Sequence, residues 1–156
     1  MFVYNMRIKP SKKLILVFAV ASAVIAVICI ACMVISQSKM PETATCDELG
    51  EYSLCAETAE EQCSFLEQFG LNPDFGGRQA TEITIPNNFN TVYNEYNSLQ
   101  KTIGLDLGKY KGKIVDMVTY PLKNSDEKAV LLVYRGTVIG GHITNGEYGG
   151  ENKPLI

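Results

Sequence analysis

The sequence predicts an α+β protein with an N-terminal transmembrane helix and a small two-layer extracytoplasmic domain, built as helix, strand, helix and a three-stranded antiparallel meander. Two observations carry this prediction. An uncharged apolar run near the start is long enough to cross a bilayer. Beyond it, the hydrophobic residues recur at three-to-four spacing, typical of helices, and later alternate, as in strands. Helices followed by a run of strands indicate an α+β arrangement.

Residues 14–35 form the predicted transmembrane helix. They read LILVFAVASAVIAVICIACMVI without a charge, and at ~1.5 Å per residue they span the ~30 Å hydrocarbon core of a bilayer. The run exceeds the ~7–15 apolar residues of a signal peptide, so we expect it to be retained. Lysine and arginine are frequent in segment 1–13, which has no acidic residue. The positive-inside rule therefore places segment 1–13 in the cytoplasm and the C-terminal domain outside the cell membrane.

A lipoprotein anchor is the alternative to a membrane-spanning helix. The sequence Cys29-Ile30-Ala31-Cys32 has a small residue before a cysteine late in an apolar stretch, as in a bacterial lipoprotein processing site. However, Cys29 stands where such sites have a leucine-like residue, and the apolar run continues past Cys32. Two cysteines buried in the membrane are the simpler interpretation.

The charge distribution separates the two parts of the chain. All 17 acidic residues follow Met40 and face only 9 basic ones there, which gives the outer part a net charge of −8. An acidic surface lacks the lysine and arginine stripe that phosphate contacts need, so we expect no nucleic-acid partner. The expected partners are the membrane, through residues 14–35, and an envelope protein or cell-wall component.

A polar linker is predicted over 36–51, and a domain over 52–150, followed by a tail at 151–156. Thr58 and Glu61 have the spacing of a capping box, which predicts that a helix begins after Thr58, and Gly70 would end it. The segment Thr81–Pro86 alternates polar and apolar residues, as a half-buried strand does.

A second helix is predicted to begin at Asn87 or Asn88 and to end before Gly104. Its helical spacing gives one apolar stripe, formed by Phe89, Val92, Tyr93, Tyr96, Leu99 and Ile103. Three strands follow, at 113–122, 128–134 and 137–144, with Arg135-Gly136 as the last turn. The pair Gly140-Gly141 would allow a bulge or the close approach of another backbone.

The outer cysteines, Cys46, Cys55 and Cys63, show no Cys-x-x-Cys spacing. Together with His142 they reach the four ligands of a zinc site but in no recognised pattern, so no metal site is predicted, and no cofactor motif is present. An oxidising compartment would allow one disulfide, with Cys46 and Cys55 as one pairing. Cys63 falls on the apolar face of the first helix, where a free cysteine buries well.

No catalytic residue is assigned. His142 is the only histidine, and no Gly-x-Ser-x-Gly turn presents a serine to it. An envelope-associated hydrolase that uses Asp106 with His142 is kept as the alternative function. The candidate binding residues are polar or aromatic groups near the second helix and the glycine pair: Tyr96, Asn97, Gln100, Asp106, Tyr110, Lys111, Gly140, Gly141 and His142.

Five short motifs resemble those of the bacterial family called domain of unknown function 4830. They are FL..FG from Phe65 to Gly70, IP..F from Ile85 to Phe89, YN.LQ from Tyr96 to Gln100, DL..YKGK from Asp106 to Lys113, and IGG from Ile139 to Gly141. The resemblance covers about Tyr52 to Ile143. Relatives tend to have tryptophan at the place of Leu71 and aspartate at that of His142, so this chain departs from the pattern at both.

The resemblance implies small membrane-anchored or secreted proteins of Firmicutes, mainly Clostridia, and no assigned reaction. Together with the residues, it predicts a single-pass membrane protein whose outer domain is a binding or regulatory module of the cell envelope.

Overall fold

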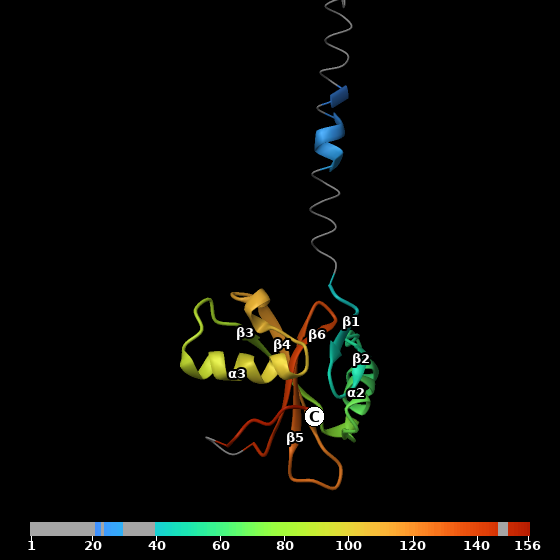
Figure 1. Ribbon diagram of the computed structural model, residues 1–156. Coiled ribbons are helices and arrows are strands. Elements are labelled where there is room, and N and C mark those ends of the chain that lie inside the picture. Colours follow the sequence, from blue (N-terminus) through green and yellow to red (C-terminus); the bar gives the residue numbers. More distant parts are fainter. Residues whose placement is uncertain (1–20, 23, 30–39, 147–149) are drawn as a thin grey trace, which may run out of the picture. The chain divides into compact units, whose positions relative to one another are not determined.

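The computed structural model describes residues 21–22, 24–29, 40–146 and 150–156 (Figure 1). The chain forms two units, residues 1–39 and 40–156. In the first unit, residues 21–22 and 24–29 are helical. Segment 1–13, Cys32 and the rest of the predicted span 14–35 lie outside the described residues. Within the described part of the chain, no helix combines the length and the apolar character needed to cross a membrane.

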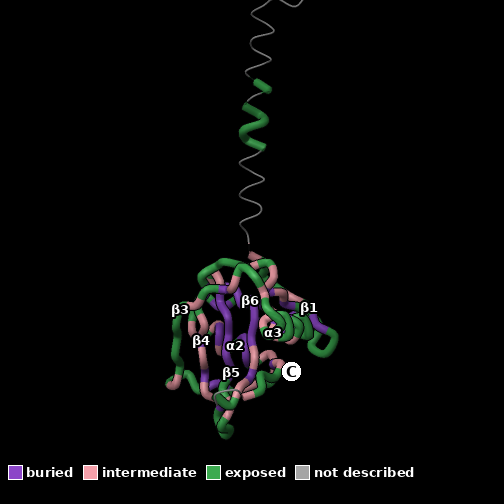
Figure 2. Tube along the Cα trace, turned by 90° about the vertical axis from the view of Figure 1, so that its left-hand side faces the viewer, coloured by how far each residue is buried: buried purple, intermediate pink, exposed green. Residues whose placement is uncertain are grey.

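The second unit is built on a four-stranded antiparallel sheet in the order β3-β4-β5-β6 (Figure 2). The strands are β3 (Gln79–Thr84), β4 (Ile114–Pro121), β5 (Lys128–Tyr134) and β6 (Thr137–Thr144). The predicted meander is therefore present as β4 to β6, with the bounds of β5 and β6 as expected. The strand predicted near Thr81–Pro86 is not separate from it, because it pairs with β4 and makes the sheet one strand wider.

A second, two-stranded sheet was not predicted. It is a hairpin of β1 (Thr43–Cys46) and β2 (Gly50–Ser53), most of which lies in the range predicted as a polar linker. The hairpin packs against the core through Cys46 and Tyr52, which are both buried. The Tyr52 hydroxyl donates a hydrogen bond to the carbonyl of Ile103, and this contact between distant segments is invisible in the local sequence.

Two α-helices and two short 3₁₀ helices complete the unit: α2 (Ala59–Gln68), η1 (Phe75–Gly77), α3 (Thr91–Thr102) and η2 (Leu107–Tyr110). The capping box of α2 is confirmed, with the Thr58 hydroxyl accepting from the Glu61 N–H and the Glu61 carboxylate accepting from the Thr58 N–H. The cap of α3 is Asn90, not Asn87 or Asn88. All three asparagines suit a cap, so residue type alone does not choose among them.

The two helices lie on opposite faces of the sheet, so the domain has three layers and not the predicted two (Figure 1). One buried cluster joins α2 and the β1-β2 hairpin to Val118, Tyr120 and Leu131. The other joins α3 and η2 to Val115 and Leu132. Because both faces of β5 are covered, the strand has almost no solvent-facing positions, and this explains its uninterrupted apolar run.

The outer edge of β6 is closed by segments from both ends of the unit. The Val138 N–H donates to the Leu54 carbonyl at 2.9 Å, and the Ile143 N–H donates to the Lys153 carbonyl at 2.9 Å. Leu155, in the segment predicted as a tail, is buried in the core. The predicted bulge is confirmed, because the pairing of β5 with β6 shifts register beside Gly140.

Candidate functional site

The segment after α3 is shaped by Asn97 and Asp106. The Asn97 amide donates to Asp106 Oδ1 at 2.9 Å, and its Oδ1 accepts from the Leu107 N–H at 2.7 Å. Asp106 caps η2 by accepting from the Gly108 N–H at 2.9 Å. The hydrogen bond from Asn97, followed by that from Gly108, lowers the pKa of the Asp106 carboxyl, so it is ionised at neutral pH. These bonds hold the start of η2, the short helix that carries Lys109 and Tyr110.

Gln100 and the glycine pair form the contact between α3 and β6. The Gln100 Oε1 accepts from the Gly141 N–H at 2.7 Å, and the whole residue is buried. A Cβ at position 140 would lie 3.1 Å from Leu107 Cδ2 and 3.2 Å from Gln100 Oε1. The glycine at this position therefore lets the side chains of Leu107 and Gln100 pack directly on β6, whereas the sequence predicted a bulge or the close approach of a backbone.

Tyr96 and His142 extend the same contact. The Tyr96 hydroxyl lies 2.8 Å from His142 Nδ1, and the two rings meet edge to face. Burial lowers the pKa of His142 to about 4, and burial raises the pKa of Tyr96. Both side chains are therefore neutral at pH 7, and the imidazole acts there as a packed, hydrogen-bonded group.

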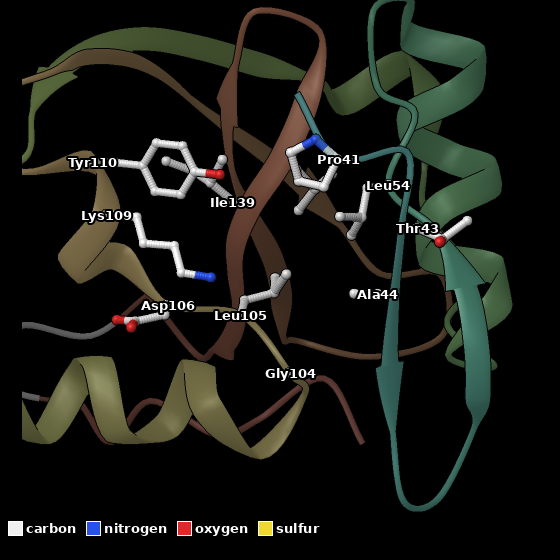
Figure 3. Close-up of a pocket in the computed structure, with 11 residues that line it drawn as sticks. Pro41, Thr43, Ala44, Leu54, Gly104, Leu105, Asp106, Lys109, Tyr110 and Ile139 are labelled. Atoms are coloured by element: carbon white, nitrogen blue, oxygen red, sulfur yellow. The ribbon is translucent and has the colours of Figure 1, made fainter. Parts of the chain in front are cut away.

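A pocket of about 150 Å³ opens beside η2 (Figure 3). Its wall combines four distant parts of the unit, namely the segment from Pro41 to the start of β1, Leu54 just after β2, the segment from Gly104 to Tyr110, and the start of β6. The lining residues are Pro41, Thr43, Ala44, Leu54, Gly104, Leu105, Asp106, Lys109, Tyr110, Val138 and Ile139. The pocket thus exists only when the β1-β2 hairpin packs beside η2 and β6.

The polar and apolar groups occupy different sides of this pocket. Figure 3 shows Lys109 and Tyr110 reaching from η2 toward Pro41 and Leu54, whereas the Asp106 carboxylate points away from them. An ammonium and a phenol hydroxyl are hydrogen-bond donors, and the opposite wall is mostly hydrocarbon, with Thr43 as its one hydroxyl-bearing residue. The pocket can therefore hold a small group that has an apolar stem and an anionic or carbonyl oxygen.

A comparison with known protein families identifies the family of the chain. The model of the family described as Domain of unknown function (DUF4830) matches residues 65–143, which contain all five motifs noted in the sequence. The chain belongs to the DUF4830 family. No curated protein and no solved structure matches it.

The DUF4830 match covers only part of the pocket wall. Asp106, Lys109, Tyr110 and Ile139 lie inside the matched range. Pro41, Thr43, Ala44 and Leu54 come from the segment before it. Asp106 and Tyr110 were among the predicted binding residues, whereas Lys109 and the hairpin residues were not. The alternating lysines of KYKGK are a weak local signal for Lys109. The hairpin residues have no local signal, because they reach the pocket through a long-range contact between Leu54 and Val138.

The other predicted residues of the DUF4830 domain lie elsewhere. The α3–β6 contact brings together Gln100, Gly140, Gly141 and the Tyr96–His142 pair, whereas Asn97 joins α3 to the start of η2. The Lys111 ammonium lies 4.5 Å from the centre of the Phe89 ring, outside the pocket wall. Hence two of the nine predicted residues, Asp106 and Tyr110, line the pocket, while most of the rest hold its supporting framework.

The chemistry considered for catalysis and metal binding is not assembled in the described part of the chain. Asp106 and His142 belong to separate hydrogen-bond networks, one with Asn97 and the other with Tyr96. No group of histidine, cysteine and acidic residues there is arranged to hold a metal ion. Cys46, Cys55 and Cys63 are free thiols, so the considered pairing of Cys46 with Cys55 is absent.

Proposed function

We propose that this DUF4830 protein is a single-pass membrane protein whose outer domain binds an envelope protein or a cell-wall component through the pocket beside η2. The observation that carries the proposal is the pairing of Lys109 and Tyr110 with an apolar wall. A charged donor next to hydrocarbon distinguishes a specific recognition surface from an ordinary solvated patch.

The size of the pocket limits its ligand. At about 150 Å³ it is smaller than the ~300–1,000 Å³ of pockets that enclose drug-sized molecules or cofactors. It suits one protruding side chain or chain end of a larger partner. Lys109 favours a carboxylate or another anionic oxygen, and Pro41 and Ala44, which are more accessible than the buried Leu54 and Ile139, favour a short hydrocarbon stem. An acidic side chain of a protein, or a carboxylate-bearing wall component, meets both requirements.

A binding role also agrees with the use of the polar residues. Neighbouring backbone and side-chain groups form hydrogen bonds with Asn97, Asp106 and Gln100. The Tyr96 hydroxyl lies within hydrogen-bond distance of His142. Such internal networks give rigidity, whereas an acid/base catalyst must reach a substrate proton. No observation favours the alternative hydrolase that would use Asp106 with His142.

In-cell crosslinking of the full-length protein tests the pocket. A photo-crosslinking residue replaces Thr43, an exposed residue of the pocket wall, in one variant and Lys123, which is exposed outside the pocket wall, in the control. We expect a discrete adduct from position 43 that is weakened by Lys109→Met and absent from position 123. Equal adducts from both positions would refute recognition through this pocket.

Membrane placement requires its own experiment. Protease is added to intact cells whose wall has been removed, and the chain is followed with an antibody against the domain. Cleavage of the domain without cell lysis is the expected result. Protection until the membrane is broken would contradict the outward orientation, whatever the crosslinking shows.

A further inference from the structure

The strand β3 forms an edge of the four-stranded sheet, and no described segment hydrogen-bonds to the backbone of its outer side. Figure 2 shows β3 along the margin of the sheet, where five of its six residues are exposed. The strand QATEIT contains neither proline nor lysine, the residues with which proteins commonly protect such edges. By contrast, the opposite edge at β6 is covered by Leu54, Gln100 and Lys153.

The backbone direction identifies which groups of β3 are free. The Ile85 N–H donates to the Lys113 carbonyl, and the Ile85 carbonyl accepts from the Gly112 N–H, so both groups of Ile85 point toward the β4 side. Because backbone groups alternate in direction along a strand, those of Ala80, Glu82 and Thr84 point outward. They form a ladder of the kind that an added strand can join.

The side chains beside this ladder are acidic. Glu82 lies directly opposite Asp116 of β4, on the same face of the sheet. Facing like charges are unfavourable across a strand pair, and within the described residues neither carboxylate has a hydrogen bond or ion pair that would offset this repulsion. A cation placed on the outer side of Glu82 would relieve it.

The same face offers an apolar contact. Ile114 is 62% exposed and pairs with Thr84, two residues along β3 from Glu82. Glu82, Ile114 and Asp116 line a shallow pocket of about 160 Å³ together with Arg135, whose guanidinium lies over the Tyr134 ring. An added strand would thus face Glu82 and Thr84 directly, whereas Ile114 lies one strand further in and is reached only by a long apolar side chain that crosses Thr84.

We propose that β3 accepts an extended strand of a partner protein, with a lysine or arginine of that strand beside Glu82. This surface is separate from the pocket beside η2. A second copy of this chain is the less suitable occupant, because the antiparallel register that pairs all three outward residues, with Ala80 opposite Thr84, sets Glu82 against Glu82.

Peptide binding to the full-length protein in detergent micelles tests this proposal. The probe is a labelled nine-residue peptide of alternating threonine and valine with a central lysine, and its matched control has a central glutamate. Fluorescence anisotropy should show roughly tenfold tighter binding of the lysine peptide, a preference that decreases as salt is added. Equal binding of the two peptides would overturn the proposal.

Three substitutions separate the ladder from the charge. Glu82→Pro removes an outward N–H without removing a bond to β4, so it should abolish binding of both peptides. Glu82→Gln keeps the N–H and should remove the preference for lysine. Glu67→Gln, at an exposed acid on α2, should change neither. Unchanged binding by the Glu82→Pro variant would contradict strand addition.

Hydrogen exchange of the unmodified protein makes the test independent of how the variants fold. With the lysine peptide bound, the amides of Ala80, Glu82 and Thr84 should exchange at least about tenfold more slowly, while those of Thr81 and Ile83 should change little. Protection confined to other segments would refute the assignment. A dimer in sedimentation that disappears in Glu82→Pro, without peptide binding, would show a second copy as the occupant and overturn the proposed partner.

Discussion

Gln100 accepts a hydrogen bond of 2.7 Å from the backbone N–H of Gly141, and this bond ties α3 to the outer edge of β6. It lies between the contacts of Val138 with Leu54 and of Ile143 with Lys153. The Gln100 Nε2 has no partner among the described groups. Gln100 therefore provides, through its side-chain oxygen, the hydrogen-bond acceptor that a neighbouring strand would otherwise offer to β6.

Replacing that oxygen should destabilise the domain. Gln100→Met keeps the length of the side chain but leaves the buried Gly141 N–H without an acceptor, while it also removes the unpaired Nε2. The two changes oppose each other, so we expect a net loss of about 1 kcal/mol in the free energy of unfolding by urea. Lys101→Met, one residue away and exposed, should change it by less than about 0.5 kcal/mol. Unaltered exchange of the Gly141 amide would contradict this role of Gln100.

His142 should make the stability of the domain depend on pH. Its pKa is lowered to about 4 by burial, whereas an unfolded histidine titrates near 6.5, so between these values the unfolded chain binds a proton that the folded chain does not. The stabilisation is complete above pH 6.5 and is lost as pH falls to 4, by about 2–3 kcal/mol. Urea unfolding at pH 7, 5.5 and 4 measures it.

His142→Phe is the control for that titration, because it keeps an aromatic ring and removes the ionisable group. Its stability should vary much less over the same pH interval. Asp106 does not interfere, since its pKa is lowered from 3.8 and its contribution is lost only at more acidic pH. An identical pH slope in the variant would show that other groups are responsible.

Gly141 should be coupled to the C-terminal segment. A Cβ at this position would lie 2.7 Å from Leu155 Cδ1 and 3.2 Å from Leu131 Cδ2. Gly141→Ala should therefore displace Leu155, and Leu155→Ala alone should cost about 2–5 kcal/mol as a large-to-small change in the core. The double variant should be about 1 kcal/mol more stable than the sum of the two predicts, as measured by a double-mutant cycle. Strict additivity would rule out the contact.

Gly104 should be the more sensitive of two glycines with similar backbone angles. Gly104 and Gly70 have φ values of 80° and 73°, but only at Gly104 would a Cβ collide with the backbone carbonyl of Thr45. Gly70→Ala should cost about 1–2 kcal/mol, from its conformation alone. Gly104→Ala should cost at least about 1 kcal/mol more in thermal unfolding, because β1 must move. Equal losses would show that β1 is not held against this turn.

Local sequence was sufficient wherever the determining contacts are local. The capping box of α2 depends on Thr58 and Glu61, three residues apart, and both partners were visible. The bounds of β5 and β6 follow from an apolar run interrupted by a turn at Arg135 and Gly136, where both φ angles are positive. The family assignment was likewise readable, because its motifs lie within one continuous stretch.

Long-range contacts account for what could not be predicted. The predicted apolar stripe of α3 is only partly buried, because its aromatic residues pack against the core and Ile103 is buried, whereas Val92 is 71% exposed. The fully buried residues within the helix are instead the amides Asn97 and Gln100. The reason is that α3 covers a sheet edge and the start of η2, where unpaired backbone groups require amides. The same limit applies to the pocket, because Pro41 and Leu54 reach it through the unpredicted hairpin.

The closure of β6 by Lys153 and Leu155 has a consequence for how the protein is made. Residues 54 and 153 flank one strand from opposite ends of the unit, so neither the sheet edge nor the core beneath it is complete while residue 155 is still inside the ribosome. We therefore expect the domain to acquire its final packing only after synthesis has passed this point, and a nascent chain that stalls earlier to present an open β6 edge to chaperones and proteases.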